Sequence, residues 1–172
     1  MGFLAKGNTL LLIALASGST NQRLTIADAL VGSGKSRLVA YSQTTPGGND
    51  PERRTQILRS ALEGLEAASV RTDPKPRHGG LIVTHCLTEL EAQAIRARGG
   101  VIWHLYGPPS GAVIIYPADV MVSIAPSGAP SHVFTPLEAL SELMFLHTLP
   151  TLRNRRRASP APAAPGILHL PR

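Results

Sequence analysis

Two short segments of this chain carry residues of the types that bind phosphate. A phosphate-binding loop needs a strand that leads into it, glycines that let backbone amides close around the phosphate oxygens, and a helix whose positive N-terminus faces them. A lysine then reaches the outer phosphates, and a serine or threonine holds Mg²⁺. Each segment satisfies only part of these requirements, so each is a hypothesis to be judged by its surroundings.

The segment at residues 32–36 has the residues of a Walker A motif without the context. It reads Gly32-Ser33-Gly34-Lys35-Ser36. The glycine expected six positions before the lysine is Ala29, and residues 24–31 predict a helix where the motif needs a strand. This segment is the alternative to the phosphate loop at residues 18–23, and its phosphate-binding residues would be Gly32, Gly34, Lys35 and Ser36. A flexible helix-to-strand connection is the interpretation that the context favours.

The segment at residues 18–23 has the context without the residues of the motif. An apolar strand at residues 9–16 leads into a polar turn, which a helix at residues 24–31 follows. The predicted phosphate-binding residues are Gly18, Ser19, Thr20, Asn21, Gln22 and Arg23. The turn binds an anion at the helix N-terminus or is an unoccupied connection. If the chain is catalytic, Arg23 and Lys35 are the candidate catalytic cations.

Other candidate groups predict less. His85 and Cys86 are adjacent at a strand end, so their side chains point to opposite faces and cannot chelate one metal together. The remaining histidines lack ligand spacing, and no metal site is predicted. Glu91 and Asp119 are candidates for a substrate site, although a helix cap or a solvated carboxylate is the favoured role. No Ser/His/Asp grouping stands out from the sequence.

The C-terminal segment concentrates the basic charge of the chain. Residues 1–146 hold twelve Lys and Arg against eleven Asp and Glu, whereas residues 147–172 hold five Arg and no acid. Arginines 153, 155, 156 and 157 (Arg153, Arg155, Arg156, Arg157) precede a stretch rich in proline and alanine. We therefore expect a domain at residues 1–146 and a disordered or partner-bound tail at 147–172. The tail binds nucleic acid or an acidic protein surface, or is an inert solubilising segment.

Strands and helices alternate along the part that must position these groups. The predicted strands are residues 9–16, 38–42, 81–84, 101–105, 112–116 and 120–124. The predicted helices are residues 24–31, a helix that begins at Asp50-Pro51, one from the Thr88/Glu91 capping box to Arg98, and one from Thr135-Pro136 to about Leu146. This alternation predicts an α/β three-layer sandwich with a mostly parallel sheet and ligands at the carboxyl ends of its strands.

Composition sets the expected compartment. The single cysteine, Cys86, rules out an intrachain disulfide and favours a reducing interior, so the expected location is the cytoplasm. No apolar run reaches the ~18 residues of a membrane span, so no membrane partner is expected. Residues 1–16 also look like a secretory signal, but their positive region is weak and Asn8 and Thr9 interrupt it. A buried first strand explains the same residues.

Taken in order, these segments resemble the deoxynucleoside-monophosphate kinases of bacteriophages, which are related in fold to adenylate kinase. That family has a strand ending in Asp-Val-Arg, a helix containing Glu-Ala-x-Ala-Ile-Arg, then Gly-Gly and another strand. Here the helix reads Glu91-Ala92-Gln93-Ala94-Ile95-Arg96 and Gly99-Gly100 follows. Residues 11–30 resemble the family's phosphate site and residues 119–128 its late strand and turn. The likeness covers about residues 9–146 and implies a P-loop kinase-like fold that uses ATP and Mg²⁺ if active.

The departures from the family pattern fall on the residues of the chemistry. Where the family has Gly-Ser-Gly-Lys-Ser or Thr, this chain has Thr20-Asn21-Gln22-Arg23-Leu24, and a leucine cannot ligate Mg²⁺. Where the family has Asp-Val-Arg, this chain has His85-Cys86-Leu87. Phosphoryl transfer depends on positioned positive charge and metal, so these losses leave little expected rate.

Three functions are compatible with this pattern. The first, which is favoured together with the third, is a kinase-like protein, a pseudokinase in effect, that binds a nucleotide or a partner without rapid catalysis. The second is an active phage deoxynucleoside-monophosphate kinase in the host cytoplasm. The third is a phage structural or assembly component that uses the fold as a scaffold and the arginine-rich tail as an anchor.

Overall fold

The computed structural model describes residues 10–43, 50–71, 79–108, 110–125 and 127–157. The chain divides into two compact units, Met1–Leu140 and Ser141–Arg172. The first unit contains the sheet and the helices that cover it, and it holds the candidate sites.

The first unit is built on one six-stranded sheet in which every pairing is parallel. The strands are β1 (Leu11–Ala16), β2 (Leu38–Tyr41), β3 (Gly80–Val83), β4 (Val101–Leu105), β5 (Val120–Val122) and β6 (Val133–Phe134). Their order in the sheet is β2-β3-β1-β4-β5-β6. The central strand β1 pairs on one side with β3 and on the other with β4. The predicted α/β class with a parallel sheet is confirmed.

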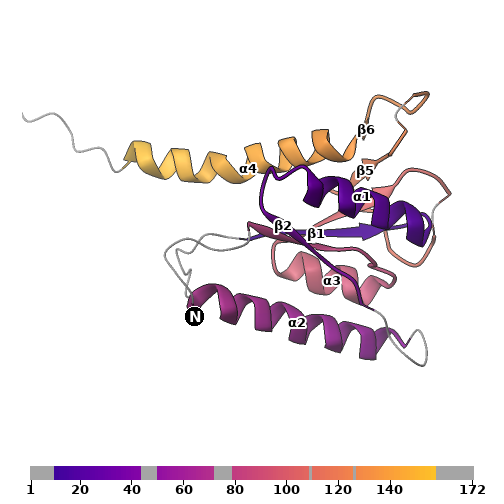
Figure 1. The fold of residues 1–172 in the computed structure, drawn as a ribbon, viewed down its shortest axis with the longest axis horizontal. Coiled ribbons are helices and arrows are strands. Elements are labelled where there is room, and N and C mark those ends of the chain that lie inside the picture. The colour runs from indigo at the N-terminus through magenta and orange to yellow at the C-terminus, as the bar shows by residue number, and fades with distance from the viewer. Residues whose placement is uncertain (1–9, 44–49, 72–78, 109, 126, 158–172) are drawn as a thin grey trace, which may run out of the picture. The chain divides into compact units, whose positions relative to one another are not determined.

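Helices lie on both faces of this sheet. Figure 1 shows α1 (Thr20–Gly32) over one face and α2 (Pro51–Arg71) and α3 (Glu89–Ala97) under the other. Right-handed crossovers require this division, because the connection from β1 to β2 runs one way along the sheet while those from β2 to β3 and from β3 to β4 run the opposite way. The arrangement of the first unit is therefore helix, sheet, helix.

The buried side chains of β1 divide between the two faces of the sheet. Ala14 and Ala16 belong to the buried cluster that Leu58 of α2 and Ile95 of α3 share. Because successive side chains of a strand alternate between faces, the larger Ile13 lies on the α1 face. All of these side chains are buried.

Helix starts follow the predicted caps. Asp50 accepts the Glu52 amide at 3.1 Å at the start of α2, and Thr88 forms the expected capping box with Glu91. Helix α1 starts at Thr20, four residues before the prediction. The reason is a second capping box, in which Ser19 Oγ accepts the Gln22 amide and Gln22 Oε1 accepts the Ser19 amide.

The structure differs from the predicted elements at two places in the later part of the chain. Residues 112–116 form no strand, because side chains of α3 bind their backbone: Ile114 donates its amide to Glu89 and accepts from Arg96 through its carbonyl. The short strand β6 was not expected.

The last helix, α4 (Pro136–Arg157), continues past its expected end near Leu146 and across the boundary between the two units. The helix passes Pro150 into an arginine-rich segment, and arginine has good helix propensity. Residues 147–157 of the expected tail belong to this helix, and residues 158–172 lie outside the described chain.

Candidate functional site

Polar groups gather where β1 ends and α1 begins. Only Ser17, Gly18 and Ser19 separate the strand from the helix, and the first two have left-handed backbone conformations with φ of 62° and 64°. A Cβ on Gly18 would lie 2.7 Å from Leu105 Cδ2, so the turn packs directly against the end of β4. This turn occupies the position where the sequence predicts a phosphate loop.

Arg23 points back into this turn from the first turns of α1. Its Nη1 donates to Ser17 O at 2.9 Å and to Gly18 O at 2.7 Å, and its Nη2 donates to Thr20 Oγ1 at 3.3 Å. Its Nε donates to His85 Nδ1 at 3.2 Å. The residue is 5% exposed, and this burial lowers the pKa of its guanidinium. Arg23 is therefore a positive charge held by the turn's own carbonyl oxygens.

The hydrogen bonds of this turn are arranged differently from those of a phosphate-binding loop. A phosphate loop directs amides at its ligand, whereas here the carbonyls of Ser17 and Gly18 face the cation in the middle. The Ser19 and Gln22 amides are used by the capping box. Within the described chain, the first-turn amides of Thr20 and Asn21 have no protein acceptor.

The carboxyl ends of β2 and β3 hold a buried ion pair beside Arg23. Arg54 Nη2 of α2 lies 3.0 Å from Glu91 Oε1 and also donates to His85 O at 3.2 Å. Glu91 is fully buried, and its second oxygen accepts the amides of Leu87 and Thr88. These contacts give Glu91 the cap role that its spacing indicates, together with a charge partner that the sequence did not predict.

His85 and Cys86 point to different environments, as their adjacency on an extended segment predicts. The His85 ring faces Arg23, and desolvation, followed by the charge of Arg23, lowers the pKa of the imidazole. Cys86 lies in the buried cluster beneath the sheet, where burial raises the pKa of its thiol to about 12. A thiol with that pKa is a packing group and not a nucleophile at neutral pH.

A second polar chain, missed at the sequence level, starts at Ser17. Ser17 Oγ lies 3.4 Å from His104 Nδ1, and His104 Nε2 lies 3.0 Å from Asp119 Oδ2. Asp119 also accepts from Arg96 at 2.7 Å and from the Tyr116 amide at 2.9 Å. The parallel register brings the group together, because Ala16 is paired with His104 in the sheet. Only the strand pairing carried this signal, and no local spacing reveals it.

The alternative phosphate loop at residues 32–36 lies at the opposite end of the strands, where β2 begins. Gly32 is the last residue of α1, and Lys35 and Ser36 precede β2, so this segment joins a helix to a strand. Its end lies beside Gly79, whose amide donates to Arg37 O at 3.0 Å just before β3. Lys35 is exposed and lies where strands begin, away from the groups that end β1 and β3.

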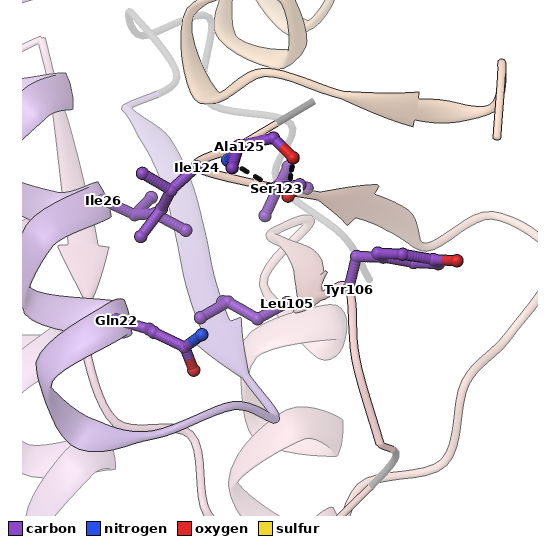
Figure 2. Close-up of a pocket in the computed structure, with 8 residues that line it drawn as sticks. Gln22, Ile26, Leu105, Tyr106, Ser123, Ile124 and Ala125 are labelled. Carbon is purple, nitrogen blue, oxygen red and sulfur yellow. Dashed lines mark hydrogen bonds between the residues drawn. The ribbon is translucent and has the colours of Figure 1, made fainter. Parts of the chain in front are cut away.

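A shallow cavity of about 120 Å³ opens between α1 and the ends of β4 and β5. Figure 2 shows Gln22 and Ile26 of α1 on one side, Leu105 at the end of β4, and residues 123–125 on the opposite side. Ser123 Oγ donates to Ala125 O and fixes the bend of this segment. The volume is well below the ~300–1,000 Å³ of most small-molecule sites.

The remaining predicted residues lie in the second unit. The four arginines between residues 153 and 157 are on the last turns of α4, and their side chains lie outside the described part of the structure. Their nucleic-acid or acidic-protein partner stays a prediction. Among the described helices, none has both the length and the apolar character that a membrane crossing needs.

Comparisons with protein-family models, with curated proteins and with solved structures gave no match to this chain.

Proposed function

We propose that this protein is a kinase-like nucleotide-binding domain, a relative of the deoxynucleoside-monophosphate kinases, that does not transfer phosphate. The observation that carries the proposal is the side chain of Arg23. It occupies the position that the resemblance assigns to the phosphate-binding lysine, yet its guanidinium bonds to the carbonyls of Ser17 and Gly18. A cation held in this way has no free donors directed at a transferring phosphoryl group.

The residues around the turn do not fit Mg²⁺-ATP. Leu24 follows Arg23 where a metal-holding hydroxyl is needed, and the neighbouring Thr25 Oγ1 donates to Asn21 O at 2.9 Å inside the helix. Three residues between strand and helix also provide fewer amides than a loop that wraps a phosphate group. Catalytic loss and an intact fold are therefore compatible, because the turn is stabilised by its own bonds.

The position of the cavity favours binding of a nucleotide through its base. In parallel α/β sheets, ligands bind beyond the carboxyl ends of the strands, near the strand where the chain reverses its direction along the sheet. That strand is β1 here, since its connection leads toward β2 while the connection from β4 leads toward β5. The cavity lies between α1 and the ends of β4 and β5, with Ile26 and Ile124 as apolar walls. A flat heterocycle fits this geometry, with Gln22 and Ser123 as polar neighbours.

A calorimetric comparison of nucleosides and nucleotides tests this function. We expect at least one nucleoside to bind, the matching triphosphate to bind within about threefold of it, and Mg²⁺ to change neither affinity, because the base supplies the contacts. A tenfold or larger gain from the triphosphate with Mg²⁺ would show a working phosphate site. Absence of binding by every nucleoside and nucleotide at millimolar concentration would remove the nucleotide function.

Two isoleucines of equal exposure provide matched variants. Ile124 lines the cavity and Ile115 does not, and each is 48% exposed. We expect Ile124→Asp to weaken nucleoside binding at least tenfold and Ile115→Asp to leave it unchanged. Equal behaviour of the two variants would place the ligand elsewhere.

A further inference from the structure

The chain Ser17, His104 and Asp119 has the composition and connectivity of a nucleophile, a base and an orienting carboxylate. The separations are 3.4 Å from Ser17 Oγ to His104 Nδ1 and 3.0 Å from His104 Nε2 to Asp119 Oδ2. Nothing in the nucleotide-binding function uses these three side chains. We propose that Ser17 is an activated nucleophile that accepts an acyl group from a small carboxylic ester, with His104 as its general base.

The contacts of Asp119 fix which ring nitrogen of His104 is the base. An ionised carboxylate only accepts hydrogen bonds, and Asp119 Oδ2 already accepts from Arg96 Nη2 and from the Tyr116 amide. His104 Nε2 therefore carries the hydrogen in the neutral ring, which leaves a lone pair on Nδ1 facing the serine. Serine proteases use the two nitrogens in the opposite sense, but a relay needs only one bare nitrogen toward the nucleophile and one N–H toward the carboxylate.

The backbone at Ser17 resembles the sharp strand-to-helix turn that presents nucleophilic serines in α/β hydrolases. Ser17 follows the last residue of a central parallel strand, precedes a helix and has φ of 62°. A non-glycine residue in this region is strained, and such strain is concentrated at functional sites. The residue after the nucleophile commonly supplies an oxyanion-stabilising amide, and here it is Gly18, whose amide has no acceptor within the described chain.

Burial limits the size of the acyl group. Ser17 is 5% exposed and His104 is fully buried, and the contact between their side chains is itself buried. The close approach of Gly18 to Leu105 narrows the space beside it. A short acyl group such as acetyl is therefore the class that fits.

The reaction is balanced without a metal or a redox partner. The Ser17 proton moves to His104 Nδ1 as Oγ bonds to the carbonyl carbon, and Gly18 stabilises the oxyanion. The adduct expels the alcohol, which takes the proton from Nδ1 as the ester C–O bond breaks. Water then gives a proton to Nδ1, attacks the acyl-serine and releases the carboxylic acid, and the proton returns to Ser17.

Covalent trapping tests this site in the full chain. We expect p-nitrophenyl acetate, which carries the short acyl group, to acetylate one residue per chain, located on Ser17 by peptide mass spectrometry. Ser17→Gly suits the left-handed backbone and should abolish labelling, while Ser110→Ala, at an exposed serine, should not. Absence of an adduct on Ser17 in the folded wild type overturns the proposal, as does an adduct on other residues only.

Variants of His104 and Asp119 show whether Ser17 is activated by these two residues or is labelled only because reagents can reach it. General-base assistance contributes ~10²–10⁴-fold, so His104→Gln should slow labelling of Ser17 at least a hundredfold, with the exposed His132→Gln unchanged. Asp119→Asn should slow labelling, and Asp119→Glu should restore part of the rate because it returns the carboxylate. Each variant is first checked for a wild-type circular dichroism spectrum. If His104→Gln does not fold, the comparison of Asp119→Asn with Asp119→Glu takes its place. Equal labelling rates for Asp119→Asn and wild type would then overturn the proposal that His104 and Asp119 activate Ser17.

Discussion

The turns before and after α1 contain different halves of a phosphate site. The turn at residues 17–19 follows a central strand and precedes a helix, but its cation is Arg23, which bonds to the turn itself. The connection at residues 33–37 has the glycine, lysine and serine, but it follows a helix and precedes a strand. The turn at residues 17–19 therefore has the strand–turn–helix position of a phosphate loop, and the connection at residues 33–37 has the residue types of one. The difference teaches that the residue types of a motif and the strand–turn–helix context it needs can occur separately in one chain, and neither segment combines them.

The clearest way to test the comparison is to remove each cation in turn. Arg23→Ala leaves the buried carbonyls of Ser17 and Gly18 without their donor, so we expect the free energy of unfolding to fall by about 2–3 kcal/mol. Lys35→Ala removes an exposed side chain and should change it by less than ~0.5 kcal/mol. Urea unfolding followed by circular dichroism measures both. Arg23→Lys, which keeps the charge but not the planar donors, should recover only part of the loss. Equal effects of Arg23→Ala and Lys35→Ala would break the comparison.

A smaller effect is expected from pH, because only one of the four bonds of Arg23 involves a titrating group. His85 Nδ1 accepts from Arg23 Nε, and burial together with the charge of Arg23 lowers the pKa of this histidine. As pH falls below ~6.5, the unfolded chain takes up a proton that the folded chain resists, so stability is lost down to the lower folded pKa. The other charges near His85 are those of Arg54 and Glu91.

The contribution of His85 is measured as a difference between two proteins. Unfolding free energies of wild type and His85→Gln are compared between pH 7.5 and pH 5, because glutamine can still accept from Arg23 and does not titrate. The wild type should lose more stability on acidification than the variant. Parallel curves for the two proteins would mean that the 17–23 region is insensitive to this histidine.

The smallest effects concern the backbone, since both turns hold one non-glycine residue at positive φ. Ser17 has φ of 62° and Arg37 has φ of 46°. Arg37→Gly relieves the strain and should raise stability by up to ~0.5 kcal/mol, whereas Ser17→Gly also removes the contact with His104 Nδ1 and should lower it by up to ~1 kcal/mol. Thermal denaturation of both variants shows whether each substitution raises or lowers stability. A stabilising Ser17→Gly would show that the serine side chain contributes nothing to its turn.

Much of the framework could be predicted from the sequence because its signals are local. Apolar runs mark the buried strands β1, β3 and β4, and the caps at Asp50 and Thr88 mark two helix starts. These features depend on neighbours a few residues apart. The failed strand at residues 112–116 has the same apolar pattern, but its backbone is bound by Glu89 and Arg96, which lie on a helix earlier in the chain.

The site could be predicted only in position. The sequence placed a polar turn at the end of β1, but it could not show that Arg23 folds back onto Ser17 and Gly18 instead of facing a ligand. The contact between Ser17 and His104 joins residues 87 positions apart and depends on strand register. The ion pair of Arg54 and Glu91 similarly requires α2 and α3 to pack together. Such contacts follow from the tertiary arrangement alone.

The placement of β1 also has a consequence for the order of events as the chain is synthesised. Leu11 pairs with Gly80 and Ile13 with Val101, so β1 is bonded on both edges by strands that come much later in the sequence. An apolar segment made early thus waits for its neighbours, and contacts of such long range slow folding and leave surface open to association in the meantime. Nascent chains that stop before Val101 would lack β4, which pairs with one edge of β1. In such chains the apolar β1 would be the segment most in need of a chaperone.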